Sequence, residues 1–243
     1  MHISVFDHEG ALAAALATRV ADLVAARPAT VLGLPTGRTP LPFYEQLVAL
    51  SRARGLDWSE VRTFNLDEFV GLGAGDPGSY RRFMEERLFA PLGIAPGQVG
   101  FLDGRAGDLE AECARYEAAI AAAGGIDLQL LGIGANGHIG FNEPGDHLEA
   151  PTHVVTLLAR SRAANALWFG GELARVPGQA LSMGMAAILR SREIILLATG
   201  AEKAEAVQAA VRGPLTTRVP ASFLQLHPRV SLFLDAEAAE RLG

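Results

Sequence analysis

The chain is 243 residues long, with 49% hydrophobic and 20% charged residues, and 21 basic against 27 acidic side chains give a net charge of −6. This acidic balance argues against a nucleic acid or an anionic membrane surface as the main partner. The single cysteine, Cys113, excludes an internal disulfide framework and a cysteine-rich metal site, and it fits a reducing compartment.

The first residues carry acidic side chains rather than a targeting signal. Asp7 and Glu9 lie where a signal peptide would have a basic residue and an apolar run. Apolar runs elsewhere, such as Ile194 to Ala198, are far too short to span a bilayer. The sequence therefore predicts a cytoplasmic protein with no membrane partner.

Short apolar, β-branched runs alternate with amphipathic segments along the whole chain. Such runs are typical of strands buried on both faces, and the alternation predicts an α/β fold, a single domain over residues 1–243 with a mainly parallel central sheet flanked by helices. The expected strands are Thr30–Leu34, Val61–Asn65, Asp127–Ile133, His153–Leu157, Glu193–Thr199 and Val230–Asp235. The expected helices include one through Leu12 and Leu23, one from Leu41, one from Leu109 after Asp108 as N-cap, and one over Ala201 to Arg212.

A glycine-containing turn with two threonines follows the first of these strands. Thr36, Gly37, Arg38 and Thr39 lie between the strand and a helix, an arrangement that favours a bound phosphate because free N–H groups and the helix dipole both attract anions. A capped turn, with Thr39 as N-cap and Pro40 as the first helical residue, explains the same residues equally well. The Lys-Ser/Thr pair of a Walker loop is absent.

Two acids follow the next strand. Asp67 and Glu68 are flanked by Phe64, Leu66 and Phe69, so we expect one carboxylate of this loop to be partly desolvated, with a raised pKa suited to a general base. The alternative is a solvated acidic loop.

The loop after Asp127–Ile133 places four glycines around one histidine. Gly132, Gly134, Gly137 and Gly140 let the backbone approach a ligand closely, while Asn136 and Glu143 are suited to orient the imidazole of His138. The alternative is a glycine-rich turn around a hydrogen-bonded core histidine. No histidine pair has metal-ligand spacing and the loop lacks the third glycine of a dinucleotide fingerprint, so the sequence predicts neither a metal nor a dinucleotide.

Taken in order, these segments resemble the glucosamine-6-phosphate deaminase family. The resemblance rests on Leu32–Gly37, Phe64–Phe69, Gly132–Pro144, Ser161-Arg162-x-x-Asn165, Lys203-Ala204 and Leu224–Pro228, and it spans nearly the whole chain. It implies a Rossmann-like fold and the reversible conversion of glucosamine 6-phosphate to fructose 6-phosphate and ammonia, without a cofactor. The implied partner is therefore a small amino-sugar phosphate, and the chain would act as a monomer or simple homo-oligomer.

The same resemblance assigns roles to individual residues. Asp67 matches the base that removes the C2 proton, and His138 matches the residue that opens the sugar ring, with Asn136 and Glu143 beside it. The phosphate would lie among Thr36, Gly37 and Thr39, with Arg162 and Lys203, the only lysine in the chain.

Four positions depart from known members of the family. Asn136 stands where those members have Asp, and Arg38 where a small residue is common. The allosterically regulated members, whose effector is N-acetylglucosamine 6-phosphate, have Arg and Lys at the positions of His153 and Val155. The chain therefore resembles the short, non-allosteric branch.

Two other functions fit a fold of this kind. A 6-phosphogluconolactonase has a similar histidine loop, but Ile139–Pro144 fits the deaminase pattern and a lactonase has no need for Asp67 as a carbon-acid base. A sugar-phosphate sensor needs a DNA-binding domain, for which residues before 30 or after 235 leave no room, and it has no use for Asp67, His138 and Glu143 together.

Overall fold

The computed structural model describes residues 1–243 and has a seven-stranded, entirely parallel sheet at its centre. The strand order is β1-β10-β9-β6-β2-β3-β5. The strands are β1 (His2–Phe6), β2 (Val31–Leu34), β3 (Arg62–Asn65), β5 (Val99–Gly100), β6 (Leu128–Gly132), β9 (Glu193–Ala198) and β10 (Val230–Asp235). This Rossmann-like α/β arrangement confirms the predicted fold class.

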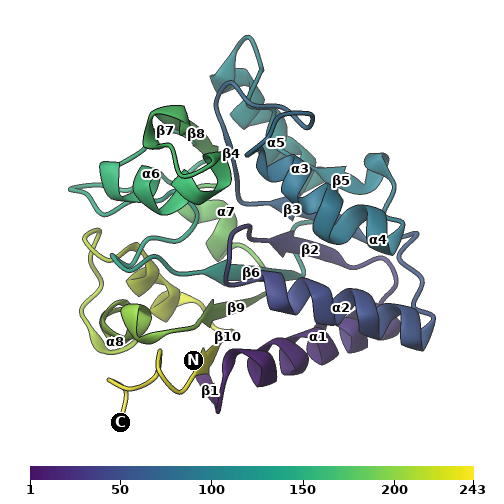
Figure 1. Ribbon diagram of the computed structural model, residues 1–243, viewed down its shortest axis with the longest axis horizontal. Helices are drawn as coiled ribbons and strands as arrows, with labels where there is room; N and C mark the ends of the chain where they lie inside the picture. Colours follow the sequence, from purple (N-terminus) through teal and green to yellow (C-terminus); the bar gives the residue numbers. More distant parts are fainter.

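Helices cover both faces of this sheet (Figure 1). One layer is formed by α1 (Glu9–Ala26) and α2 (Leu41–Arg54), and the other by α5 (Leu109–Ala122), α7 (Met185–Leu189) and α8 (Ala204–Arg212). Successive residues of a strand point to opposite faces, so Ile195 packs toward α1 and α2 while Ile194 and Leu196 pack toward the other layer. The continuous apolar runs of the sequence follow from burial on both sides.

The predicted helices form, with small differences at their starts. The side chain of Asp108 caps α5 by accepting the Ala111 N–H, as expected. The helix predicted over Ala201 to Arg212 begins with the 3₁₀ turn η5 (Ala201–Lys203) before α8. The residue before α2 is Pro40, which offers no side-chain cap, so the interpretation of Thr39 as N-cap is wrong.

A second, three-stranded antiparallel sheet was not predicted. It consists of β4 (Asp67–Phe69), β8 (Gln179–Ser182) and β7 (His153–Thr156), in that order. Residues 67–69, expected as a loop, are therefore a buried strand, and β7 is half-exposed rather than buried on both faces. Three-residue β4 is too short for a period-two pattern, and β7 owes its strand to pairing with β8 rather than to the main sheet.

The remaining elements pack around this small sheet and the edge of the large one. The aromatic side chains of Phe69, Tyr80, Phe141 and Phe169 form a separate cluster with Ala180 of the small sheet. The remaining helical elements are α3 (Tyr80–Met84), η1 (Glu85–Phe89), α4 (Ala90–Leu92), η2 (Pro96–Gln98), α6 (Ala159–Asn165), η3 (Ala166–Phe169), η4 (Leu173–Arg175) and η6 (Pro220–Leu226). None of the helices combines the length and apolar character that crossing a bilayer requires.

Candidate active site

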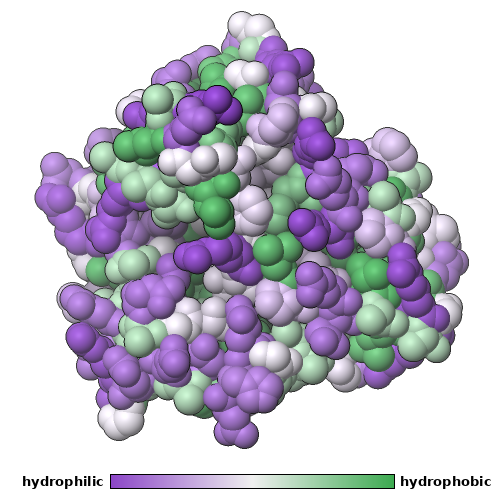
Figure 2. Space-filling model, viewed as in Figure 1, coloured by the Kyte–Doolittle hydropathy of each residue, from purple (hydrophilic) through white to green (hydrophobic).

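A cavity of about 900 Å³ opens at the carboxyl ends of the parallel strands. The chain runs from β2 outward to β3 and β5, and then from β6 in the opposite direction to β9 and β10, so the order reverses between β2 and β6. Ligands of open α/β sheets bind at such a reversal. Loops after β2, β6 and β9 all line the cavity, and near the middle of the face in Figure 2 hydrophilic residues lie beside hydrophobic ones.

The loop between β2 and α2 presents unpaired backbone donors. The N–H groups of Thr36, Gly37, Arg38 and Thr39 donate to no protein acceptor, and all four residues line the cavity. Gly37 has a φ of 106°, a conformation that favours glycine, and this turns the loop around the space in front of α2. Such a nest of donors at the start of a 14-residue helix is suited to an anion.

Asp67 is a buried carboxylate without a donor. Its side chain is 6% exposed, lines the cavity, and accepts no hydrogen bond from the protein. It lies beside Gly140 of the histidine loop, where a Cβ in place of the glycine hydrogen would be 3.8 Å from Asp67 Oδ2. Burial, and secondarily the charge of Glu68, raise the pKa of Asp67 to about 8. A carboxylate with this pKa is a strong enough base to hold a proton taken from carbon.

The neighbouring acid, Glu68, has a different role. Its carboxylate accepts the Ser79 hydroxyl at 2.7 Å and the backbone N–H groups of Phe69, Tyr80 and Arg81 at 2.8 to 3.1 Å. Burial still raises its pKa, although these hydrogen bonds oppose the shift. Glu68 does not line the cavity, so it anchors the start of α3 and only Asp67 is presented to a ligand.

His138 is held by Asn136, which is held in turn by Glu143. Asn136 Nδ2 donates to Glu143 Oε2 at 3.1 Å, and Asn136 Oδ1 lies 2.7 Å from His138 Nδ1. A carboxylate only accepts, so the amide must turn its NH₂ toward Glu143 and its oxygen toward the imidazole. The imidazole therefore carries its proton on Nδ1 and leaves the Nε2 lone pair free. His138 also packs against Gly134, where any side chain would collide with its ring.

The surroundings favour the neutral imidazole. Burial lowers the pKa of His138, the carboxylate of Glu143 opposes this, and the positive charges of Lys203 and Arg160 lower it further. In the resting protein Nε2 is consequently a proton acceptor rather than a donor. Asn136 transmits the orientation imposed by Glu143 without bringing a second negative charge into contact with the ring.

We expect this tautomer to be visible by NMR. In a ¹H–¹⁵N correlation spectrum, His138 should have a protonated Nδ1 and a bare Nε2, and it should stay neutral below the ordinary histidine pKa of about 6.5. Asn136→Asp places a carboxylate on Nδ1 and should raise this pKa, whereas Asn136→Leu removes the acceptor and should allow both tautomers. A positively charged His138 at pH 7 in the unaltered protein would contradict this interpretation.

A chain of hydrogen bonds joins His138, Asn136 and Glu143, here called the histidine relay, to α6. The Ser161 hydroxyl donates to Glu143 Oε1, Asn165 Nδ2 donates to the Ser161 carbonyl at 2.9 Å, and the Tyr80 hydroxyl donates to Asn165 Oδ1 at 2.8 Å. The helix α6 thus connects the histidine loop to α3, and its position bears on the orientation of His138.

The structure brings most of the predicted site residues together. Lys203, on η5 after β9, and Arg38 both line the cavity with Asp67 and His138, while Glu143 lies behind His138. Arg162 does not line the cavity. Its guanidinium donates to the carbonyls of Leu173 and Val176 at 3.2 and 2.9 Å.

Several cavity residues were not anticipated as site residues, among them Tyr80, Arg160, Asn165 and Trp168. On an α-helix, residues four positions apart share a face, so knowledge that Ser161 faces the cavity would have pointed to Asn165. No cluster of three or more His, Cys, Asp or Glu side chains is arranged to hold a metal ion.

Comparisons with known proteins agree on one family. Residues 7–232 match the family described as glucosamine-6-phosphate isomerases/6-phosphogluconolactonase. A glucosamine-6-phosphate deaminase 1 of Giardia intestinalis is 51% identical over 93% of this chain and 85% of its own length. Glucosamine-6-phosphate deaminase 2 of Bacillus subtilis is 46% identical over the whole chain and 98% of its own length.

Solved structures give the same result. A structure described as a monomeric glucosamine-6-phosphate deaminase has a TM-score of 0.96 and 43% identity, and it covers 99% of this chain and 100% of its own. A 6-phosphogluconolactonase from Thermotoga maritima has a TM-score of 0.73 at 20% identity, covering 96% and 97%. The second likeness shows a shared fold alone.

Proposed function

The chain belongs to the family of glucosamine-6-phosphate isomerases and 6-phosphogluconolactonases, and we infer that it is a glucosamine-6-phosphate deaminase. The reaction converts glucosamine 6-phosphate and water to fructose 6-phosphate and ammonia. It requires an open sugar chain, a base for the C2 proton and an anchor for the phosphate.

His138 is suited to open the ring. Its free Nε2 takes the proton of the O1 hydroxyl and returns it to the ring oxygen, and the bond between C1 and that oxygen breaks to give the aldehyde. The imidazole is transiently positive during this transfer, and Glu143, 3.6 Å from Nδ1, stabilises that charge through space and through Asn136. A proton relay of this kind typically contributes about 10²–10⁴ in rate.

Asp67 is suited to move the proton from C2. Its carboxylate removes the C2 proton of the open chain while the substrate's ammonium group passes a proton to O1, so that an enolamine forms between C1 and C2. Asp67 then returns its proton to C1, which gives the protonated imine at C2, and water adds there as ammonia leaves. The absence of protein donors leaves both carboxylate oxygens available, and the Gly140 backbone leaves room for the substrate beside them.

The phosphate fits the loop in front of α2. The N–H groups of Thr36 to Thr39 have no protein acceptor, and Lys203, whose pKa the charge of Arg38 lowers, lines the same cavity. With the dipole of α2 they supply donors and positive charge for a dianion.

One observation favours the deaminase over the lactonase: the desolvated Asp67 lies in the same cavity as a neutral His138. Lactone hydrolysis needs a base for water but none for a carbon-bound proton. The deciding experiment measures ammonia released from glucosamine 6-phosphate against hydrolysis of 6-phosphogluconolactone by the same preparation. Hydrolysis of the lactone without release of ammonia would favour the alternative.

We further propose a cytoplasmic enzyme that works as a monomer or a simple homo-oligomer and is not activated by a sugar phosphate. A second cavity of about 420 Å³ lies beside His153, and its charged lining residues are acidic: Glu110, Glu117 and Glu149. An acidic surface repels a phosphate dianion.

Saturation by glucosamine 6-phosphate should therefore be hyperbolic at pH 7.5, with or without N-acetylglucosamine 6-phosphate. Initial rates over a range of both sugars test this. A Hill coefficient clearly above one that the acetylated sugar abolishes would contradict the proposal.

A further inference from the structure

Three cations without protein partners share the active-site cavity. The side chains of Arg38, Arg160 and Lys203 line it, and none of them forms an ion pair or donates a hydrogen bond to the protein. By contrast, twelve arginines of the chain form ion pairs with Asp or Glu. Cations left unpaired around one cavity indicate that the missing partner is an anionic ligand.

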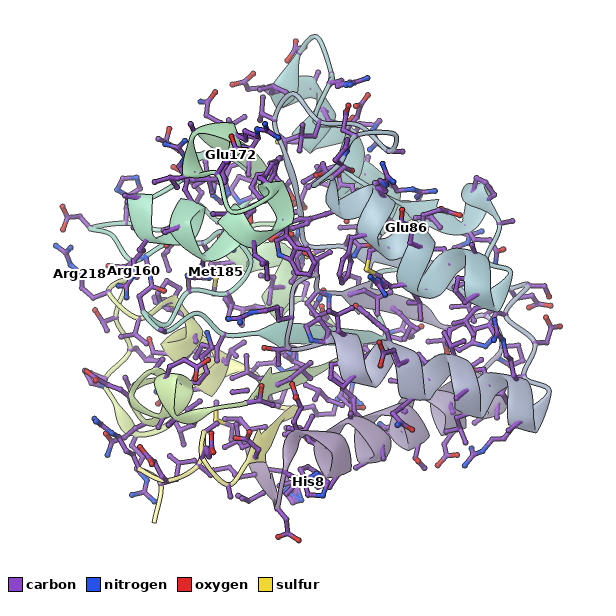
Figure 3. All side chains as sticks on the ribbon, viewed as in Figure 1. His8, Glu86, Arg160, Glu172, Met185 and Arg218 are labelled. Atoms are coloured by element: carbon purple, nitrogen blue, oxygen red, sulfur yellow. The ribbon has the colours of Figure 1, made fainter.

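The geometry of α6 decides which of its two arginines faces this cavity. On α6, Arg160 and Ala164 lie four residues apart and line the cavity, with Ser161 and Asn165 beside them. At about 100° per residue, position 162 lies some 200° around the helix from position 160. Arg162 thus points the other way, and it binds the carbonyls of Leu173 and Val176 across the following turn. In Figure 3, Arg160 lies below α6.

The charges of these cations act on other groups of the cavity. Arg160 and Lys203 both lower the pKa of His138, and Arg38, after burial, lowers the pKa of Lys203. Acids also line the cavity, but none forms an ion pair with Arg38, Arg160 or Lys203: they are Glu9, Asp67, Glu202, Asp235 and Glu237. Glu202 raises the pKa of Lys203, and Asp235 accepts the Gly200 and Ala238 N–H groups. A bound dianion would relieve the repulsion between Arg38 and Lys203.

We propose that Arg160 is the arginine that binds the substrate's phosphate, together with Lys203 and Arg38, and that Arg162 instead holds η4 against α6. The proposal rests on the deaminase function inferred above, and it reassigns the role that resemblance gives to Arg162. It also places the substrate's charge in contact with α6, the helix whose Ser161 donates to Glu143 of the histidine relay.

The experiment compares Arg160→Ala, Arg160→Lys and Arg162→Ala with Arg87→Ala, an exposed arginine without a partner and away from the cavity. Ammonia release gives KM and kcat, calorimetry gives the Kd of inorganic phosphate, and thermal unfolding gives Tm. We expect Arg160→Ala to raise both KM and the phosphate Kd about ten- to a hundredfold, because a charge-assisted hydrogen bond is lost. Arg160→Lys should recover part of the loss.

Arg162→Ala should instead lower Tm, and it should raise KM less than Arg160→Ala does. Arg87→Ala should change neither Tm nor KM. A phosphate Kd unaltered by Arg160→Ala, or a larger loss of phosphate affinity in a folded Arg162→Ala protein, would overturn the proposal. Calorimetry keeps the two inferences separate, since weaker phosphate binding by Arg160→Ala supports the anion site even if the protein released no ammonia.

Discussion

Replacing Asp67 with Asn is expected to lower kcat for ammonia release by about 10²–10⁴-fold, with little change in the affinity for sugar phosphate. Asn has the size of Asp, and the carboxylate forms no hydrogen bond with the protein whose loss would disturb the fold. The amide, however, takes up no proton from carbon. Steady-state rates give kcat, and calorimetry with fructose 6-phosphate shows whether the cavity still binds its ligand.

Exposed Asp22 provides a matched control, because Asp22→Asn makes the same chemical change far from the cavity and should leave kcat unaltered. A second comparison is Glu68→Gln, which disturbs the anchor of α3 and should reduce stability first. An Asp67→Asn protein that turned over at the rate of the unaltered enzyme would exclude Asp67 as the base.

The same substitution is expected to stabilise the fold as the pH rises. Folding raises the pKa of Asp67 from 3.8 to about 8, so the folded protein keeps a proton that the unfolded chain releases. Below about pH 4 Asp67 is protonated in the folded protein and in the unfolded chain, so it does not lower the free energy of unfolding. Between about pH 4 and 8 each pH unit lowers the free energy of unfolding by about 1.4 kcal/mol, and above about pH 8 the penalty levels off at roughly 5 to 6 kcal/mol.

Asp67→Asn removes this penalty. Its free energy of unfolding, measured by urea denaturation from about pH 4 to 8.5, should exceed that of the unaltered protein by an amount that grows with pH toward roughly 5 to 6 kcal/mol. Asp22→Asn should give a difference without this slope. A difference between the Asp67→Asn and unaltered proteins that stays constant across the range would show that Asp67 ionises normally. Active sites typically contain catalytic groups that lower the free energy of unfolding.

Much of the fold could be predicted because the signal was local. The runs at β2, β6 and β9 are continuous and apolar, and burial on both faces of a parallel sheet produces that pattern directly. The small sheet escaped prediction because its strands pair between segments far apart in the chain, as in Asp67 with Ser182. Such partners leave no trace in a short window of sequence.

The site was predictable in its members but not in its geometry. The loops after β2, β3 and β6 could be recognised from residue types at strand ends, and the histidine loop from its glycines. Which of two adjacent acids is presented, and which of two nearby arginines, depends on the face of the element that carries them. Asp67 and Glu68 lie on opposite sides of the strand β4, and Arg160 and Arg162 lie on opposite sides of the helix α6. The sequence alone did not indicate which side of either element faces the cavity.

Because Asp67 lies on a strand, insertions and deletions next to it should impair the protein. Neighbouring residues of β4 face opposite ways, so that Asp67 meets the cavity while Glu68 meets the start of α3. Deleting one codon between β3 and β4 would move Glu68 to the place where Asp67 meets the cavity and Phe69 to the anchor of α3. Inserting one codon would move Asp67 to that anchor and leave its place at the cavity without this carboxylate. Most loops of a protein tolerate such length changes. Here only Leu66 separates β3 from β4. This connection should be among the places in the chain that are least tolerant of an insertion or deletion of whole codons.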